Sequence, residues 1–503
     1  MKNIRVRFAP SPTGPLHIGN LRTALFNYLF AKKKKGSFII RFEDTDKERY
    51  IKASEKHILN SLKWCGIQAD EGPDNGNYGP YRQSKRKHIY KKYVKYLLKK
   101  NYAYYAFESK DELKQIRTEY KDKGKLFIYN YSTRKNLKNS FNNFYYNQIK
   151  KKKTKYIIRL NVPVSKTIKV YDLLRGNISI NSNVIDDKVL VKSDGNVTYH
   201  LANVIDDHLM KITHVIKGEE WISSFPILHV LYYYFNWKMP KFIHLPLILN
   251  SFGKGKLSKR NYNKLNIPIF PLKWKDPIKL KTILGYRELG YFPDALLNML
   301  ALFGWNPGCE QEIFSLKELI ATFSLKDINF SSARFDKQKI DWINHRHLQS
   351  RSIDELTRLV KLCLNEQKIY FNNDKTIKQI ILRIRSQCTF VYQIIEKAIY
   401  LFKKPTLKKN YIKKQIINIK ITKKILFLII EWFNNYDKNN LKLLRLFLAK
   451  LAFKKNINIH YFLKLLRLSL VGKLVGLEIL FIITKLKTQD IIQRICNVIL
   501  LLN

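Results

Sequence analysis

Apolar and polar residues at the start of the chain follow a pattern typical of a strand, a turn, a helix and a second strand. Residues 4–8 alternate between apolar and polar, residues 10–15 are rich in proline, and residues 17–31 repeat with a helical period. Residues 38–42 form a second apolar segment that ends at the acidic turn 43–46. This order predicts the beginning of a doubly wound α/β sheet, which binds its ligands beyond the carboxyl ends of its strands.

The pattern changes at about residue 106, where a segment rich in charged residues and asparagine begins. Strand-like stretches lie near residues 156–162 and 177–180, and we interpret residues 106–188 as an inserted α+β domain. Sheet-like alternation resumes at residues 189–192. We therefore expect the second half of the nucleotide-binding sheet after the insertion.

Beyond about residue 335 nearly the whole chain has a helical period, with leucine and isoleucine inward and lysine outward. Residues 441–453 and 461–470 are the clearest cases. This pattern predicts an all-helical, basic C-terminal domain. Ordinary solvated helix faces explain the same pattern, so it does not by itself indicate an RNA partner.

The composition is that of a large globular protein with an extreme positive charge. A length of 503 residues predicts two to four domains, and the hydrophobic share of 46% provides for packed cores. The formal net charge of +54 favours polyanionic partners, nucleic acid first and an anionic membrane second. Codon usage in an AT-rich genome would enrich lysine and asparagine in the same way. The charge therefore supports an RNA partner without establishing one.

Cysteine usage and the length of the apolar runs exclude several classes of protein. The five cysteines are scattered, and no Cys-x-x-Cys motif or Cys/His cluster occurs, so neither a disulfide framework nor a zinc site is indicated. The apolar runs are far shorter than the roughly 20 residues that span a bilayer. The first functional motif begins at Arg7, which leaves no room for a signal peptide, so we expect a cytoplasmic protein without a membrane partner.

Two segments are suited to bind phosphate groups. His17 and Gly19 stand at the start of the first helix, where an imidazole and free backbone N–H groups can hold a nucleotide. Lys256, Lys259 and Arg260 lie in a loop that can close over a polyphosphate and neutralise the charge that develops as pyrophosphate leaves. Taken alone, each segment is common by chance in a basic protein.

A third group of residues is suited to a small zwitterion with an acidic side chain. Arg7 offers a guanidinium fork for a carboxylate, and Glu43 can pair with an ammonium group. Ser11 belongs to the same sheet edge, and Tyr199, Asn203 and Lys217 come later in the chain. Composition alone does not distinguish these residues from ordinary surface polar groups.

Motifs that match those of one known family occur in the same order along the whole chain, and together they decide between the functional and the chance interpretations of the segments above. They are RFAPSPTGPLHIGN at residues 7–20, RFEDTD at 41–46, DEGP at 70–73, GPYRQS at 79–84, TYHLANVIDDH at 198–208, GEEW at 218–221, KLSKR at 256–260, LFGW at 302–305, Phe335 and Asp336 with Trp342, and RLSLVG at 467–472. On these motifs the chain resembles the bacterial-type glutamyl-tRNA synthetases, which are class I aminoacyl-tRNA synthetases.

The resemblance implies an activity and a domain organisation. The enzyme would activate L-glutamate with ATP to glutamyl-adenylate and pyrophosphate, with Mg²⁺ expected, and would then transfer glutamate to the terminal adenosine of glutamate tRNA. A monomer is expected, and activation is expected to wait for bound tRNA. The implied domains are the two catalytic halves at 1–105 and 189–250, the acceptor-end-binding insertion at 106–188, the stem-contact domain at 251–334 and the anticodon-binding domain at 335–503.

The resemblance also implies roles for individual residues, in which no side chain attacks covalently and catalysis depends on placement and charge. The implied catalytic residues are His17, Lys256 and Lys259. The implied ATP-binding residues are His17, Asn20, Trp221, Leu247, Ile248, Lys259 and Arg260. The implied glutamate-binding residues are Arg7, Ala9, Ser11, Glu43, Tyr199, Asn203 and Lys217. Anticodon contacts would come from basic residues of the helical domain near Arg383 or Arg385.

The chain departs from the family pattern at a few positions. Lys217 stands where the family usually has an arginine that grips the substrate side chain, so weaker affinity or looser discrimination against glutamine is a hypothesis. Some relatives bind zinc through cysteines in the insertion. Here Ala106 and Glu108 stand near the first pair, and no cysteine or histidine follows near Tyr131, so we predict no zinc.

Several alternatives remain to be separated. Glutaminyl-tRNA synthetases share the ATP motifs but end in β-barrels, and a shorter relative that glutamylates a modified tRNA base lacks an anticodon domain. The chain could also be a form that charges glutamine tRNA with glutamate as well, or a catalytically inactive RNA-binding paralogue. A membrane-surface protein would not need the ATP motifs.

Overall fold

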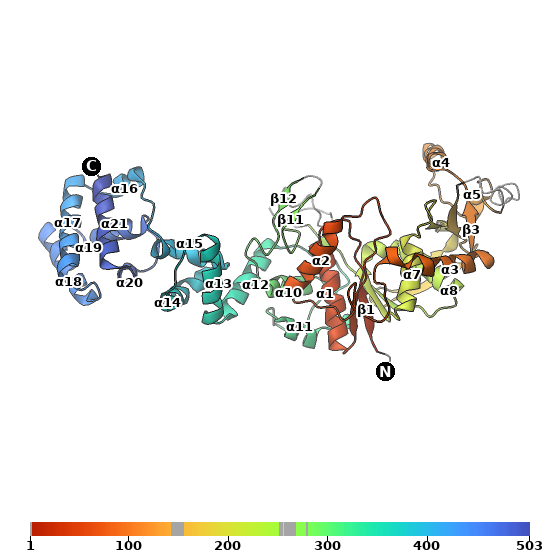
Figure 1. Cartoon of the computed structure of the whole chain (residues 1–503), viewed down its shortest axis with the longest axis horizontal. Helices are drawn as coiled ribbons and strands as arrows, with labels where there is room; N and C mark the ends of the chain where they lie inside the picture. Colours follow the sequence, from red (N-terminus) through yellow and green to blue (C-terminus); the bar gives the residue numbers. More distant parts are fainter. Residues whose placement is uncertain (1–2, 142–154, 251–254, 256–267, 278–279, 503) are drawn as a thin grey trace. The chain divides into compact units, whose positions relative to one another are not determined.

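A computed structural model of the chain describes residues 3–141, 155–250, 255, 268–277 and 280–502 (Figure 1). The chain divides into two compact units, residues 1–340 and 341–503. Each unit is described by itself. The KLSKR motif at 256–260 lies outside the described residues.

The first unit begins with the strand–helix–strand arrangement that the alternation pattern predicts. Strand β1 (Arg5–Phe8) pairs in parallel with β2 (Ser37–Ile40), and α1 (Ile18–Lys33) connects them. The apolar residues of α1 are buried along its whole length, and Lys32 and Lys33 end the helix where positive charge is favourable. The turn after β1 therefore lies at the carboxyl edge of the sheet.

The second half of the sheet contains strands from the insertion as well as from the catalytic segment. The strand order is β6-β5-β9-β8, with β5 (Thr167–Asp172), β6 (Gly176–Asn181), β8 (His214–Gly218) and β9 (Lys241–Leu245). β8 and β9 are parallel, β5 pairs with β9 at Asp172 and Phe242, and β5 and β6 form a hairpin. β8 lies beside β1, because Thr213 N donates to Arg5 O over 2.9 Å.

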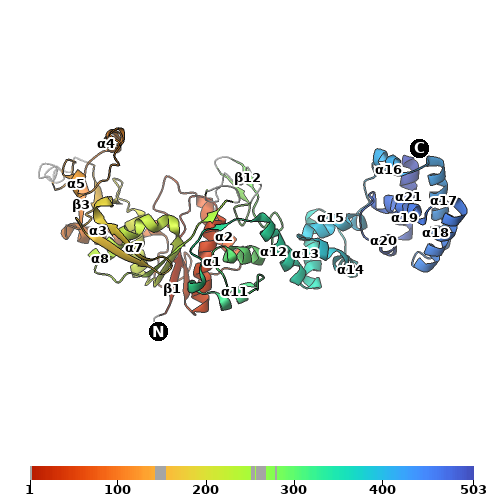
Figure 2. The same ribbon diagram turned by 180° about the vertical axis from the view of Figure 1, so that it is seen from behind.

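Helices cover both faces of these strands. On one side α1 packs with α10 (Pro293–Leu302) and α11 (Leu316–Thr322). On the other side lie α7 (Tyr199–Leu209), α8 (Phe225–Tyr234) and α3 (Lys87–Lys99) (Figure 2). Their apolar faces and those of β8 and β9 form one large core. This layered arrangement is the predicted doubly wound fold.

The remaining described elements of the first unit are short and mostly peripheral. A three-stranded antiparallel sheet in the order β3-β4-β7 lies beside α4 and α5 in the insertion. The bounds are α2 (Lys52–Trp64), β3 (Ala103–Ala106), α4 (Lys110–Asp122), α5 (Tyr131–Arg134), β4 (Ile157–Leu160), β7 (Val189–Val191), β10 (Ile248–Leu249), β11 (Trp274–Lys275), β12 (Thr282–Ile283) and β13 (Ala333–Arg334), with 3-10 turns η1 (Gln83–Arg86), η2 (Ser182–Val184), η3 (Glu219–Ser224) and η4 (Leu325–Asp327).

The second unit is helical throughout its described residues, 341–502, which contain no strand. Its elements are the end of α12 (Lys337–Ser350), α13 (Ile353–Glu366), α14 (Asp374–Ile384), η5 (Arg385–Gln387), α15 (Val391–Phe402), α16 (Lys409–Gln415), α17 (Ile419–Asn435), α18 (Leu441–Lys455), α19 (Ile459–Val471), α20 (Ile479–Lys485) and α21 (Thr488–Leu501). The predicted helices at 441–453 and 461–470 are confirmed as α18 and α19. These described residues form helices, whereas the glutaminyl-tRNA synthetases end in β-barrels.

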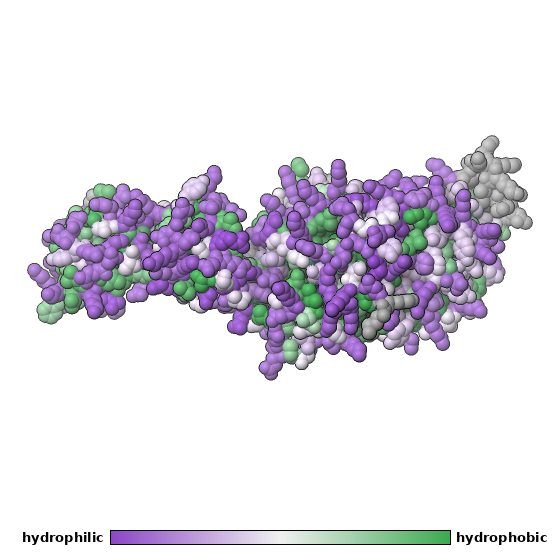
Figure 3. All heavy atoms as spheres, turned by 60° about the horizontal axis from the view of Figure 1, so that its bottom comes forward, coloured by the Kyte–Doolittle hydropathy of each residue, from purple (hydrophilic) through white to green (hydrophobic). Residues whose placement is uncertain are grey.

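The surface agrees with the composition. In the view of Figure 3 hydrophilic side chains dominate, and apolar side chains are scattered among them. A search of the described residues finds no helix with the length and hydrophobicity that a bilayer crossing requires.

Candidate active site

A cavity of about 540 Å³ at the carboxyl edge of β1 and β8 gathers the predicted site residues. Every predicted site residue that the structure describes lines it. These residues are Arg7, Ala9, Ser11, His17, Asn20, Glu43, Tyr199, Asn203, Lys217, Trp221, Leu247 and Ile248. The other three, Lys256, Lys259 and Arg260, lie outside the described residues. Segments that are 200 residues apart in the sequence thus meet at one site.

A buried network of charges forms the floor of this cavity. Asp207 accepts from Nε of Arg7 over 3.1 Å and from a terminal nitrogen of Arg41 over 2.7 Å. Glu43 accepts from Arg41 over 3.2 Å and from Nδ2 of Asn203 over 2.7 Å. Among the described residues, the hydrogen bonds of the Arg7 side chain use only its Nε, so the two terminal nitrogens of its fork remain for a ligand.

The network sets the charge state of its carboxylates. Burial raises the pKa of Glu43 to about 7, although Arg41 and Arg7 lower it. Burial alone would also raise the pKa of Asp207, but Arg7 and Arg41 hold that pKa below its usual value. Glu43 is therefore the carboxylate of this network whose charge is poised to change near neutral pH.

Lys217 is a buried cation at the end of β8. Its side chain is 7% exposed, and its Nζ lies 3.3 Å from the Tyr199 hydroxyl. No carboxylate of the described residues lies within ion-pair distance of it, and Arg7 is a positive neighbour in the same cavity. Burial, with a contribution from Arg7, lowers the pKa of Lys217 to about 7. An ammonium group buried in this way is stabilised by an anionic ligand.

Aromatic side chains form the wall beside Lys217. The rings of Tyr199 and Trp221 pack at a centroid distance of 4.6 Å, and the Lys217 ammonium lies 5.7 Å from the Trp221 ring centroid. Trp221 is 39% exposed, unlike the buried groups beneath it. It therefore offers a flat surface at the mouth of the cavity.

The opposite side of the cavity is the amino end of α1. His17 is the N-cap residue, and its Nδ1 accepts a hydrogen bond from Gly19 N over 3.1 Å. Because the first backbone N–H groups of a helix point outward and carry partial positive charge, this end of α1 is suited to bind phosphate. Asn20 belongs to the same turn and also lines the cavity.

The structure describes the residues at the positions that bind zinc in some relatives. Glu108 accepts from the Tyr129 hydroxyl over 3.0 Å, and the Arg159 guanidinium lies 3.8 Å from the centre of the Tyr129 ring. Ala106 carries no ligand atom, and Tyr131 is exposed at the start of α5. Across the described residues, no group of three or more His, Cys, Asp or Glu side chains could hold a metal ion. The absence of bound zinc stays a prediction.

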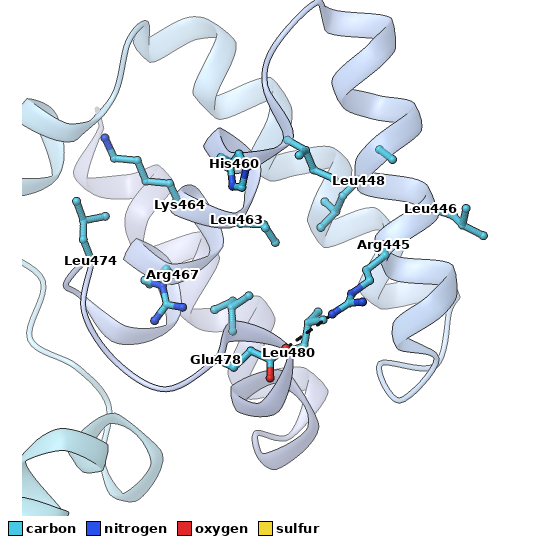
Figure 4. Close-up of a pocket in the computed structure, with 13 residues that line it drawn as sticks. Arg445, Leu446, Leu448, His460, Leu463, Lys464, Arg467, Leu474, Glu478 and Leu480 are labelled. Atoms are coloured by element: carbon cyan, nitrogen blue, oxygen red, sulfur yellow. Dashed lines mark ion pairs between the residues drawn. The ribbon is translucent and has the colours of Figure 1, made fainter. Parts of the chain in front are cut away.

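The second unit contains a separate cavity of about 730 Å³ between α18, α19 and α20 (Figure 4). Basic side chains surround an apolar floor, and Arg445 forms an ion pair with Glu478 at 3.7 Å. The basic residues are Arg445, His460, Lys464 and Arg467. Arg383 stacks on Phe481 at 3.9 Å, and neither Arg383 nor Arg385 lines this cavity, so their predicted part in anticodon contacts stays a prediction.

Some residues that shape the first cavity are not among the predicted site residues. Arg41 and Asp207 hold Arg7 and Glu43 in place, and Glu219 accepts from Leu247 N over 3.0 Å. All three lie within the matching motifs 41–46, 198–208 and 218–221. The sequence shows that charged residues stand beside the predicted site residues in these motifs. It does not show which of these charged side chains would point toward the cavity.

Comparisons with known proteins agree across both units. Residues 3–342 match the family described as tRNA synthetases class I (E and Q), catalytic domain, and residues 355–499 match an anticodon binding domain. The chain is 43% identical to the glutamate--tRNA ligase of Flavobacterium psychrophilum, with 98% of each chain covered. It is 47% identical to that of Christiangramia forsetii, with 80% of each covered.

A solved structure is similar over the whole chain. The crystal structure of a glutamate tRNA ligase from Elizabethkingia meningosepticum in complex with its amino acid matches with a TM-score of 0.92. The sequence identity is 41%, and all of both chains is covered.

Proposed function

The chain belongs to the family of class I tRNA synthetases for glutamate and glutamine, and we propose that it is the glutamate–tRNA ligase of its cell. It activates L-glutamate with ATP, releases pyrophosphate, and transfers the glutamyl group to the terminal adenosine of glutamate tRNA. It acts in the cytoplasm, as a monomer, and Mg²⁺ would supply positive charge to offset the negative charge of ATP when it is bound.

The observation that carries this proposal is the buried ammonium of Lys217, which has no carboxylate partner among the described residues, in a cavity with Arg7 and Glu43. A cavity with two cations and one anion is complementary to glutamate, which carries two carboxylates and one ammonium group. Glu43 pairs with the substrate ammonium, the free fork of Arg7 binds a carboxylate, and Lys217 binds the side-chain carboxylate. Ala9, Ser11, Tyr199 and Asn203 complete the glutamate pocket.

In the first step the glutamate α-carboxylate attacks the α-phosphorus of ATP, and the bond to pyrophosphate breaks. The amino end of α1, with His17 and Asn20, binds the phosphates, while Trp221, Leu247 and Ile248 lie along the adenosine. Lys256, Lys259 and Arg260 stabilise the charge on the departing pyrophosphate. No protein group becomes covalently attached, so catalysis consists of placement and charge stabilisation.

In the second step a ribose hydroxyl of the terminal adenosine attacks the glutamyl carbonyl, and AMP leaves. The insertion at 106–188 binds the acceptor end, residues 251–334 contact the stem, and residues 335–503 bind the anticodon. The cavity of Figure 4 has the basic rim and apolar floor that suit an unpaired base next to phosphates.

Aminoacylation of purified glutamate and glutamine tRNAs, each with labelled glutamate and with labelled glutamine, tests this function. We expect ATP-dependent attachment of glutamate to glutamate tRNA, and the glutamine tRNA arm shows whether the enzyme also charges that tRNA with glutamate. A protein that binds glutamate tRNA but charges it with neither amino acid is an inactive RNA-binding paralogue, and the proposal is then wrong.

A variant of the pocket connects the activity to the site. Glu43→Gln removes the charge that pairs with the substrate ammonium, and we expect kcat/KM for glutamate to fall at least about tenfold. The matched control is Glu119→Gln on the exposed side of α4, which removes the same charge far from the cavity. Equal effects of the two substitutions would contradict the assignment of the pocket.

A further inference from the structure

One peptide group at the nucleotide side of the cavity is held at both of its polar atoms by charged side chains. The carbonyl of Pro246 accepts from a terminal nitrogen of Arg22, and the N–H of Leu247 donates to Glu219 Oε1 over 3.0 Å. These two atoms belong to the same peptide group, which directly precedes the cavity-lining residues Leu247 and Ile248. Its plane is therefore fixed from two directions.

The two side chains come from different elements of the first unit. Arg22 lies on α1, is 3% exposed, and also donates to the Phe303 carbonyl over 2.8 Å. Glu219 begins the 3-10 turn that follows β8. A charged group that bonds to a peptide gives a stronger and more directional contact than a neutral one. The two contacts therefore satisfy both polar atoms of this peptide group with charged partners, which fix its orientation more firmly than neutral partners would.

Glu219 is itself held from the insertion. Its second carboxylate oxygen, Oε2, accepts from a terminal nitrogen of Arg175, in the turn between β5 and β6. Arg175 also packs over the Phe330 ring at 4.8 Å, and its backbone N–H donates to Asp172 over 2.9 Å. The β5–β6 hairpin thus fixes the position of Arg175. Arg175 in turn holds the carboxylate of Glu219, which accepts the hydrogen bond from Leu247 N.

We propose that Arg22, Glu219 and Arg175 are positioning residues for ATP: they fix the Pro246–Leu247 peptide group and thereby direct the backbone of Leu247 and Ile248 toward the adenosine. This inference rests on the proposed binding of ATP in this cavity. Arg22 lines the cavity, whereas Glu219 and Arg175 do not and act on it through the peptide group. Their effect is on the affinity for the nucleotide, because a rotated peptide would move the wall of the adenosine site.

Steady-state kinetics of two substitutions at each end of the ion pair test the proposal. We expect Glu219→Ala to raise the KM for ATP about tenfold, with the KM for glutamate changed less than about twofold. Glu219→Gln keeps an oxygen acceptor for Leu247 N and should restore most of the ATP affinity. Arg175→Ala should raise the KM for ATP about three- to fivefold, and Arg175→Lys should largely reverse that loss.

The control is an ion pair of similar burial elsewhere in the same unit. Arg5 and Glu71 lie 2.6 Å apart with side-chain exposures of 11% and 13%, close to the 16% and 22% of Arg175 and Glu219, and neither lines the cavity. Arg5→Ala should lower the thermal stability without a selective change in the KM for ATP. If Glu219→Ala does not fold, the Arg175→Ala and Arg175→Lys pair decides the question.

The outcomes separate this inference from the function on which it rests. A wild-type protein that forms no glutamyl-tRNA overturns the proposed function. An active wild type whose folded variants keep a normal KM for ATP, or lose ATP and glutamate affinity equally, overturns only the positioning role. A selective rise for ATP that the conservative variants reverse supports it.

Discussion

At the scale of single residues, Lys217 is the cation that we propose holds the carboxylate of the substrate side chain. An ammonium group makes one point contact with a carboxylate, whereas the guanidinium usual in this family makes two parallel hydrogen bonds. Glutamine has a neutral amide in place of that carboxylate. Discrimination between the two amino acids therefore depends on how strongly this one cation prefers a negative charge.

Replacing Lys217 with arginine should strengthen that preference. We expect Lys217→Arg to lower the KM for glutamate about three- to tenfold and to raise the ratio of kcat/KM for glutamate over glutamine by a similar factor. The measurement is charging of glutamate tRNA at a series of concentrations of each amino acid. An unchanged ratio would show that the lysine is not the source of any loss in discrimination.

The same lysine should make glutamate capture sensitive to pH near neutrality. Burial and, to a smaller extent, Arg7 lower the pKa of Lys217 to about 7, so Lys217 is charged below that pH and loses its proton above it. Glu43, with its pKa raised to about 7 mainly by burial, changes in the opposite sense and is charged above that pH. Asp207, Glu43 and Glu220 are the carboxylates that act on the lysine, and they favour its charged form.

We therefore expect kcat/KM for glutamate to follow a bell-shaped pH profile with its maximum near neutral pH. The alkaline limb reflects the deprotonation of Lys217, because only the charged ammonium pairs with the side-chain carboxylate. The acid limb reflects the protonation of Glu43. In Lys217→Arg the alkaline limb near pH 7 should disappear and the acid limb should remain, since arginine keeps its charge. An identical profile in both proteins would contradict this origin of the alkaline limb.

The residues that face the substrate could be predicted from the sequence, and those behind them could not. Arg7, Glu43 and Lys217 lie in motifs whose chemistry is recognisable from residue type, and the structure gathers them in one cavity. Asp207 holds Arg7 from the buried side, and Arg22 lines the cavity while it donates to the Pro246 carbonyl. Nothing in a linear pattern indicates that an arginine in an apolar helix donates to a carbonyl more than two hundred residues away.

At the scale of elements, the β5–β6 hairpin shows what alternation along the chain could and could not indicate. Strand-like stretches were predicted near 156–162 and 177–180, where β4 and β6 occur. The prediction did not include β5, although its residues alternate between buried and exposed. It also gave no sign that β5, which lies within the predicted insertion, joins β9 through Asp172 and Phe242. That pairing bridges seventy residues, and a local pattern carries no information about it.

Asp172 holds this junction together. Its carboxylate accepts from the backbone N–H groups of Leu174 and Arg175, and from both the backbone N–H and Nδ1 of His244. Burial alone would raise the pKa of Asp172, but these donors, His244 foremost, hold it below its usual value. A carboxylate with a lowered pKa stabilises the fold above its ordinary pKa, and this stabilisation is lost as the pH falls through the lowered pKa.

Asp172→Ala should therefore lower the free energy of unfolding by about 2–4 kcal/mol, because it leaves several buried donors without an acceptor. Asp172→Asn keeps one acceptor oxygen and should be less destabilising. The measurement is denaturant unfolding at neutral pH and at about pH 3, where wild type and the asparagine variant should differ less. A difference that does not shrink in acid would contradict the electrostatic part of this account.

At the scale of the whole molecule, the net charge of +54 attracts the phosphates of a tRNA substrate. Neutralising phosphates releases counterions, so the affinity for tRNA should fall steeply with salt, while binding of glutamate inside a closed cavity should not. The sequence could not separate this role from a codon effect, because both place lysine on exposed helix faces. Substitutions at the cavity in the second unit can distinguish a role in tRNA binding from a codon effect.

Lys464 and Lys450 form a matched pair for this test. Lys464 on α19 lines the cavity of Figure 4, and Lys450 on α18 is exposed and does not line it, so each substitution by alanine removes one positive charge from the same unit. We expect Lys464→Ala to raise the KM for tRNA about three- to tenfold and to reduce the slope of log KM against log salt by about one. Lys450→Ala should change the KM for tRNA less than about twofold, and neither variant should change the KM for glutamate. If the two variants weaken tRNA binding equally, the positive charge acts as a diffuse field and the cavity has no specific part in holding the RNA.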